Sequence, residues 1–331
     1  MNSKKWAVIV LAIILLVATS LSSIGTSTFD EENYTDNFLS RLGQPVEVIE
    51  EEGSTGSRIL KINVDGTIDG LEQPGGYSQE TTLYAVEQIQ EDPSIEAVLL
   101  SLDTPGGSVY EIREVYDLMM KVKEETDIPV YASMGSMAAS GGVYYAMMAE
   151  EVYASPETWT GSIGVIMSTL NLEGLFDKIG LEERVFKTGD LKDMGSASRE
   201  ITEEEEEVFE SMIDESFDRF VQVVMDGRDM EEDVVREIAD GRIYTAQQAQ
   251  EIDLIDDILY EDQVIDKMKS DLGLENPQIF SFEKQSSSFT SFLPFMDADL
   301  ISRLGKSELE QTMEEIEKMS QLQIEYRWEG Y

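Results

Sequence analysis

Short apolar runs alternate with helical patterns through the middle of this chain, and this alternation most limits what it can fold into. The expected strands, bounded mostly by polar or turn-forming residues, cover residues 59–64, 97–102, 129–134, 151–154, 165–169 and 183–186. The expected helices cover residues 80–90, 110–125 and 139–149. Strands that alternate with helices form a parallel sheet with helical crossovers. The sequence therefore predicts an α/β fold with a largely parallel sheet.

The later part of the chain is predicted to be mainly helical. Helical patterns cover residues 202–225, 230–239, 245–251 and 261–272. Thr202 precedes a run of glutamates and predicts a helix start, because threonine caps the first amides and acids complement the helix dipole. With 331 residues in all, we expect one large domain over residues 58–285. A polar, acidic linker at 30–57 precedes it, and a tail at 286–331 follows it.

The N-terminus carries the pattern of a membrane anchor. Lys4 and Lys5 precede an apolar run, and no charged residue follows until Asp30. The uncharged stretch 6–29 is long enough to cross a bilayer of about 30 Å as a helix. Since positive charge stays on the cytoplasmic side, we expect a cytoplasmic tail at 1–5, a single transmembrane signal anchor, and an extracytoplasmic domain at the cell membrane. A cleaved signal peptide is the alternative, because the strictly apolar core is short.

The chain contains no histidine and no cysteine. Every Ser-His-Asp and Cys-His catalytic arrangement is therefore excluded. Disulfides, thiol catalysis, zinc–thiolate sites and iron–sulfur clusters are excluded as well. We expect no metal and no organic cofactor, and any nucleophile in this chain needs a base other than histidine.

Acidic residues dominate the charge of the chain. There are 68 Asp and Glu residues against 24 Lys and Arg residues, a net charge of −44. A surface this acidic does not bind nucleic acid through phosphate contacts. The simplest interpretation is a solvated acidic surface that suits high salt. A specific cation site is the alternative, but no calcium-loop spacing supports it.

Three glycine-bearing turns follow expected strands and are the candidate places for chemistry. The turn at 103–108 leaves backbone amides uncovered, which suits an oxyanion, although an ordinary strand-to-helix loop explains it too. The turn at 136–142 places Ser140 near the start of an expected helix. There Ser140 either caps the helix or acts as a nucleophile that the helix dipole favours. The third turn, at 160–164, lies between short strands.

A serine nucleophile in this chain needs a lysine or a carboxylate as its base. A lysine serves if burial lowers the pKa of its ammonium, and a change from about 10.4 to about 7 requires on the order of 4 to 5 kcal/mol of differential interaction. Such a lysine must also be kept apart from the many carboxylates. Lys187 and Lys192 follow the last expected strand, and composition alone does not choose between them.

Five ordered segments carry motifs between residues 58 and 285. They read DTPGGS at 103–108, MGSMAASGGVYY at 134–145, TGSIGV at 160–165, KTGDLKDMGSASRE at 187–200 and GRIYTAQQAQEIDLID at 241–256. Together they resemble the signal peptide peptidase SppA family in its short Gram-positive form. The resemblance implies a ClpP/crotonase-like fold, with repeated β-β-α units, a parallel sheet and a helical C-terminal part. It also implies a serine endopeptidase that uses a Ser/Lys dyad.

The resemblance assigns roles to four residues of this chain. Ser140 in MAASGG corresponds to the nucleophile, and Lys192 in LKDM corresponds to the general base. Ser162 in TGSIG corresponds to a serine that orients the lysine amine, and the amide of Gly107 to an oxyanion-hole donor. On this basis Lys187 is a bystander.

The resemblance also implies a substrate and an assembly. The family degrades signal peptides left in the membrane, so we expect apolar peptides as substrates. Long members supply the serine and the lysine from two tandem copies, whereas this chain carries one copy. We therefore expect a homo-oligomeric ring in which Ser140 of one chain meets Lys192 of its neighbour. Two other functions stay open: an acyl-CoA enzyme of the crotonase type, which export disfavours, and a non-enzymatic scaffold. The tail at 286–331 is either loosely packed or a docking peptide.

Overall fold

The computed structural model describes residues 45–71 and 76–284. The cytoplasmic tail and anchor predicted at 1–29 and the tail predicted at 286–331 lie outside these residues, as does most of the linker predicted at 30–57. Within the described ranges, no helix is both long and apolar enough to cross a membrane.

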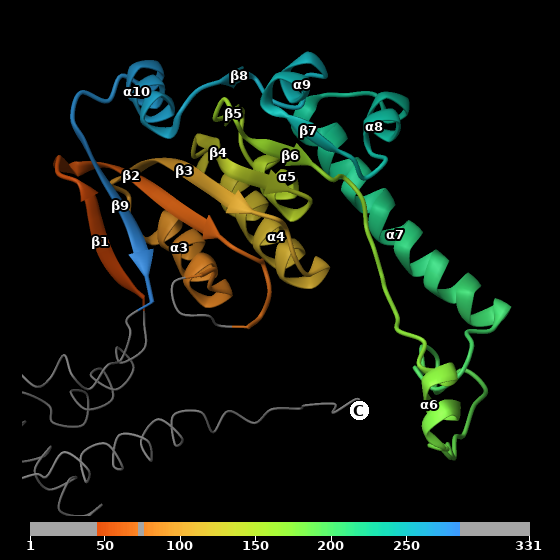
Figure 1. The fold of residues 1–331 in the computed structure, drawn as a ribbon. Coiled ribbons are helices and arrows are strands. Elements are labelled where there is room, and N and C mark those ends of the chain that lie inside the picture. The colour runs from red at the N-terminus through yellow and green to blue at the C-terminus, as the bar shows by residue number, and fades with distance from the viewer. Residues whose placement is uncertain (1–44, 72–75, 285–331) are drawn as a thin grey trace, which may run out of the picture. The chain divides into compact units, whose positions relative to one another are not determined.

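One sheet holds the described strands, in the order β1-β9-β2-β3-β4-β5-β8, and β6 pairs with β4 and β7 with β6 (Figure 1). The strands are β1 (Val46–Glu51), β2 (Ser54–Asp65), β3 (Ile95–Thr104), β4 (Val130–Ala139), β5 (Glu151–Ala154), β6 (Trp159–Gly161), β7 (Ile243–Thr245), β8 (Asp257–Ile258) and β9 (Pro277–Glu283). Among these strands, only the pairs β1–β9 and β6–β7 are antiparallel. The predicted α/β class with a largely parallel sheet is confirmed.

Single strands and helices alternate from β2 to β5. The helices of the described residues are α3 (Gln79–Glu91), α4 (Val109–Thr126), α5 (Gly141–Ala146), α6 (Glu173–Ile179), α7 (Glu203–Arg228), α8 (Glu232–Ile238), α9 (Ala246–Glu251) and α10 (Glu261–Leu272). The helices predicted after residue 202 are all present, although β7 and β8 lie between them and β9 follows the last one. The helices α3 to α5 supply the crossovers that a parallel sheet needs.

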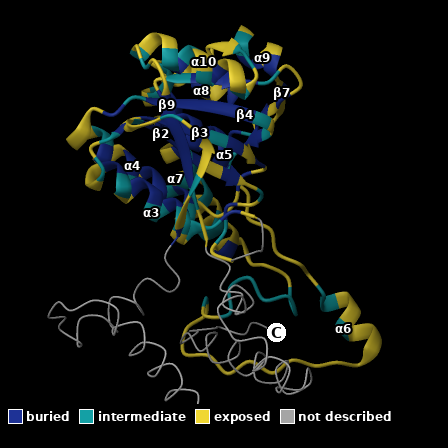
Figure 2. Cartoon of the chain, turned by 90° about the vertical axis from the view of Figure 1, so that its left-hand side faces the viewer, coloured by how far each residue is buried: buried dark blue, intermediate teal, exposed yellow. Residues whose placement is uncertain are grey.

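Alternate residues of the central strands face opposite sides of the sheet, so the sheet has two cores. Leu60 and Ile62 of β2 pack with α3, α4 and α5 in the larger core. Ile59 of β2 and Leu99 of β3 face the other way and pack against Met268 of α10. Figure 2 shows the central strands buried, with the exposed residues in the surrounding elements. The two buried faces explain the nearly continuous apolar runs of these strands.

Two predicted strands, at 165–169 and 183–186, are wrong. Both fall in the segment 165–201, which contains α6 and no strand. Ile166 and Phe186 are 93% and 96% exposed. An apolar run becomes a strand only where a neighbouring strand takes up its backbone hydrogen bonds, and these runs have no such neighbour among the described residues.

The predicted linker reaches too far into the domain. Val46–Glu51 forms β1, and β2 begins at Ser54 rather than near residue 59. Both strands pair with β9, a strand that the sequence pattern did not reveal. This pairing links residues from opposite ends of the described chain, so local sequence patterns carry no sign of it.

The turn predicted at 136–142 and the helix predicted at 139–149 also differ from the structure. Strand β4 continues through this stretch to Ala139, and α5 is a short helix, Gly141–Ala146. The strand continues because its last residues find a second partner in β6.

The predicted helix start at Thr202 is confirmed. Thr202 Oγ1 accepts a hydrogen bond from the Glu205 amide at 3.3 Å, and the Glu205 carboxylate accepts one from the Thr202 amide at 2.9 Å. Side-chain hydrogen bonds from Arg199, with that of the Thr202 amide, lower the pKa of Glu205 from 4.5 to about 2. The cap of α7 is therefore a charged one.

We predict that acid weakens this cap. Because the pKa of Glu205 is lower in the folded chain, its contribution to stability is complete above about pH 4.5 and is lost as the pH falls towards about 2. Amide hydrogen exchange in the first turn of α7, corrected for the intrinsic rate, should lose protection over this range. The matched control is α9, where uncharged Gln248 completes the same capping box with Thr245. Equal loss of protection in both helices would contradict this account.

Candidate active site

Ser140 occupies the sharp junction between β4 and α5. Its backbone has φ 52° and ψ −110°, a conformation that costs a residue with a side chain about 1–3 kcal/mol. Its amide donates to the carbonyl of Gly161 at 2.8 Å, which ties the junction to β6. The Ser140 side chain makes no capping hydrogen bond to α5. The helix-cap interpretation is therefore wrong, and no described residue engages the Ser140 hydroxyl.

A bulge in β4 leads the chain to this junction. Between Leu102 and Thr104 of β3, the facing stretch of β4 holds two extra residues. The Asp103 carboxylate braces the bulge, because it accepts hydrogen bonds from Ser136 Oγ at 2.8 Å and from the Met137 amide at 3.1 Å. Beyond the bulge, the end of β4 pairs with β6. The sequence pattern did not reveal this role of Asp103, since it depends on the register of β3 and β4.

Two glycines let the loop after β3 approach Ser140 closely. Gly106 has φ 96°, and a Cβ at this position would lie 2.8 Å from the Cβ of Ser140. A Cβ at Gly107 would lie 1.9 Å from the carbonyl oxygen of Ile68, since Gly107 forms a β-bridge with that residue. A side chain at either position would force the loop away from the junction.

Backbone amides beside Ser140 are available to an oxyanion. The amide of Ser108 donates to the Ile68 carbonyl at 2.7 Å, whereas the amide of Gly107 has no partner among the described residues. Gly141 is the first residue of α5, and the first amides of a helix have no partner within that helix. Preorganised amides of this kind stabilise the charge that develops when a serine attacks a carbonyl.

Ser162 lies next to the residue that holds the Ser140 backbone. It directly follows Gly161, it has φ 51°, and its amide donates to the carbonyl of Arg242 at 2.7 Å. No described residue makes a hydrogen bond with its hydroxyl. The structure therefore brings three predicted site residues, Ser140, Ser162 and Gly107, to one place.

Lys192 has no described contact with these three residues. It lies in the segment 165–201, which leaves the sheet after β6 and returns at α7 (Figure 1), and which is largely exposed (Figure 2). Its amide donates to the Gly189 carbonyl at 3.2 Å, and its exposed side chain has no partner among the described residues. Within the described chain, the hydrogen bonds and ion pairs of this segment stay inside residues 171–205.

The two candidate lysines differ in their surroundings. The Lys187 ammonium lies 2.7 Å from the Asp193 carboxylate and 2.5 Å from the carbonyl oxygen of Asp190. Lys187 is thus held in an ion pair, whereas Lys192 is not paired with any described residue. Lys192 stays the predicted base.

The acidic surface shows no metal site in the part of the chain that the structure describes. No three acidic side chains gather there in a way that could hold a metal ion. The predicted absence of a cofactor stays a prediction.

We predict that Gly107→Ala slows the reaction of Ser140 by about 100-fold, because the added Cβ would displace the loop whose amide stabilises the oxyanion. The rate of Ser140 labelling by a fluorophosphonate, followed by intact-protein mass spectrometry, measures this effect. Gly174→Ala is the matched control, since a Cβ at Gly174 meets nothing within 4 Å. Unchanged labelling of the Gly107 variant would exclude the loop from the site.

Comparison with known proteins shows the family to which this chain belongs. Residues 122–275 match the profile of Peptidase family S49. The chain is 34% identical over 302 residues to "Putative signal peptide peptidase SppA" of Enterococcus faecium, covering 88% of each chain. It is 32% identical over 205 residues to Protease 4 of Salmonella typhi, covering 62% of this chain and 33% of that protein. It is 31% identical over 268 residues to the chloroplastic serine protease SPPA of Arabidopsis thaliana, covering 77% and 38%. This chain therefore belongs to peptidase family S49 and is a serine peptidase.

Proposed function

We propose that this peptidase is a membrane-anchored endopeptidase that uses Ser140 and Lys192 as a catalytic dyad and degrades cleaved signal peptides at the membrane. One observation carries the proposal: Ser140 has a strained backbone and lies against a glycine loop whose Gly107 amide has no partner among the described residues. A structural serine needs none of these features. The relative in Enterococcus faecium bears the name of a signal peptide peptidase. Membership of a peptidase family leaves the acyl-CoA enzyme and the scaffold without support.

In the proposed reaction, Ser140 Oγ attacks the scissile carbonyl while the neutral amine of Lys192 takes the hydroxyl proton. The amide of Gly107 and the first amide of α5 stabilise the oxyanion. The Lys192 ammonium then protonates the leaving amine, and an acyl-enzyme ester forms. A water next gives its proton to Lys192 and attacks the ester, after which Ser140 regains a proton and the acid product leaves. The hydroxyl of Ser162 orients the amine of Lys192.

The exposed segment 165–201 supports a dyad that two chains share. Ile166, Leu170, Ile179 and Phe186 of this segment are 93%, 68%, 65% and 96% exposed. Exposed apolar side chains that cluster in one segment are typical of an interaction surface. A second copy that covers them would bring Lys192 of one chain to Ser140 of the next. Because two different faces meet in such a contact, repeated copies form a ring where the rotation closes.

Apolar side chains near Ser140 suit an apolar peptide. Val109 and Tyr110 follow the Gly107 loop and are 48% and 69% exposed, and Trp159 of β6 is 56% exposed. An extended apolar segment, such as the hydrophobic part of a signal peptide, would cover them and bury its own side chains. The anchor predicted at 6–29 would hold the domain on the extracytoplasmic side of the cell membrane, next to such peptides.

We predict that two inactive variants restore activity when they assemble together. Ser140→Ala and Lys192→Ala should each abolish turnover of a fluorogenic apolar peptide by the full chain in detergent. Co-expressed in equal amounts, they should recover about one quarter of wild-type activity, because one in four neighbouring pairs then combines an intact serine with an intact lysine.

The control for this experiment is Lys121→Ala, which removes an exposed lysine of α4 and should leave the rate unchanged. Recovery of no activity in the mixed assembly would place both dyad residues in one chain. Full activity of Lys192→Ala alone would exclude Lys192 as the base.

A further inference from the structure

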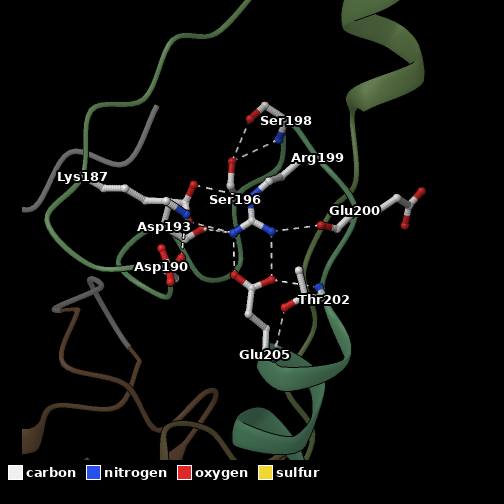
Figure 3. A network of polar contacts seen from close by, with 9 residues as sticks. All are labelled: Lys187, Asp190, Asp193, Ser196, Ser198, Arg199, Glu200, Thr202 and Glu205. Atoms are coloured by element: carbon white, nitrogen blue, oxygen red, sulfur yellow. Dashed lines mark hydrogen bonds and ion pairs between the residues drawn. The ribbon is translucent and has the colours of Figure 1, made fainter.

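Figure 3 shows a network of charged side chains that joins Lys187, Asp193, Arg199 and Glu205. Arg199 donates to the Asp193 carboxylate at 2.7 Å and to the Glu205 carboxylate at 2.8 Å. Lys187 donates to the same Asp193 carboxylate at 2.7 Å. Asp193 directly follows Lys192 in the chain. The network therefore holds in place the residue next to the proposed base.

The network joins this turn to the start of α7. Arg199 also donates to the carbonyl of Asp193 at 3.2 Å and to the carbonyl of Glu200 at 2.9 Å. The side chain of Glu205, in the first turn of α7, is only 1% exposed, and that of Asp193 is 15% exposed. One guanidinium thus connects the turn at 189–196 to the capped end of a long helix.

The charges of the network balance. Two cations, Lys187 and Arg199, meet two carboxylates, Asp193 and Glu205. Hydrogen bonds from Arg199, and then from Lys187, hold the pKa of the Asp193 carboxyl far below its usual range. Both carboxylates therefore stay charged near neutral pH, and Lys187 and Arg199 are the cations that pair with them among the described residues.

The surroundings of the turn are otherwise acidic. Its own segment contributes Asp190 and Glu200, α6 in that segment begins with Glu173 and has Lys178 in its last turn, and the first turn of α7 adds Glu203, Glu204 and Glu206. A carboxylate near a lysine favours the protonated ammonium. A lysine base in this setting needs its nearest carboxylates to be neutralised.

We propose that Arg199 is a positioning residue for Lys192: it fixes the turn 189–196 to α7 and offsets the charges of Asp193 and Glu205, so that Lys192 is able to lose its proton. The inference rests on the proposed function, in which Lys192 is the base. In this role Arg199 affects the protonation of Lys192 without a contact to the lysine side chain among the described residues.

The test is the pH dependence of kcat/KM for the full chain in detergent at low salt. Arg199→Met leaves Asp193 and Glu205 without their shared cation, so the midpoint of the rising limb should move to higher pH, by about one unit. Asp193→Asn leaves Lys187 and Arg199 with one carboxylate fewer, so the midpoint should move to lower pH. The double variant should lie near the wild type. All shifts should shrink at high salt, where charges are screened.

The matched control is Arg236→Met. Arg236 likewise joins two carboxylates, Asp218 and Glu232, each at 2.7 Å, but it lies on α8. Its loss should leave the midpoint unchanged.

Opposite shifts in the Arg199 and Asp193 variants would support the proposal. A lower kcat/KM at every pH with an unmoved midpoint would overturn it and make the network purely structural. If Arg199→Met does not fold, the Asp193→Asn variant alone tests the proposal. A midpoint at lower pH would support it, and an unmoved midpoint would overturn it. Undiminished activity of Lys192→Ala is a separate result, which would refute the proposed function itself.

Discussion

The close approach of the loop after β3 to the β4–α5 junction is the constraint on which the site depends. It exists because Gly106 and Gly107 carry no side chain, and because the carboxylate of Asp103, in the same stretch, holds the bulge of β4. The end of β3 and the loop after it thus shape the strand that carries Ser140 and place the Gly107 amide, the proposed oxyanion donor, beside it. The strained backbone of Ser140 persists because pairing with β6 and a fully buried central sheet determine its position.

Charge poses a second constraint on a peptidase without histidine. A lysine base works only when it is neutral, yet this chain carries a net charge of −44. The structure places Ser140 and Lys192 on different parts of the chain. The proposed nucleophile lies at the end of β4 among glycines and small residues. Lys192 lies on an exposed segment, where the carboxylate of the adjacent Asp193 is paired with Lys187 and Arg199. Such a division suits an active site completed by assembly, since removal of water from the lysine then follows from contact between chains.

Features that depend on local pattern were predictable, and features that depend on distant pairing were not. The strands at 59–64 and 97–102 and the cap at Thr202 follow from short-range periodicity and capping chemistry, and they are confirmed. Strands β1 and β9 escaped prediction because β1 pairs with β9, and β9 pairs with β1 and β2, all across long sequence separations. For the site, the motifs identified the turns that converge at Ser140. The uncapped Ser140 hydroxyl and the hydrogen bonds of Asp103 to the β4 bulge could not be predicted, because they depend on the register of the sheet, which no single segment encodes.

The central claim is that Ser140 of one chain meets Lys192 of another, and crosslinking tests it most directly. The chain has no cysteine, so a Ser140→Cys/Lys192→Cys variant carries only the two thiols of interest. A short bismaleimide added to the full chain in detergent should give a ladder of covalent multimers on a denaturing gel, and the two single-cysteine variants should not. A crosslinked product that stays at the mass of one chain, with both cysteines joined in the same molecule, would contradict the account.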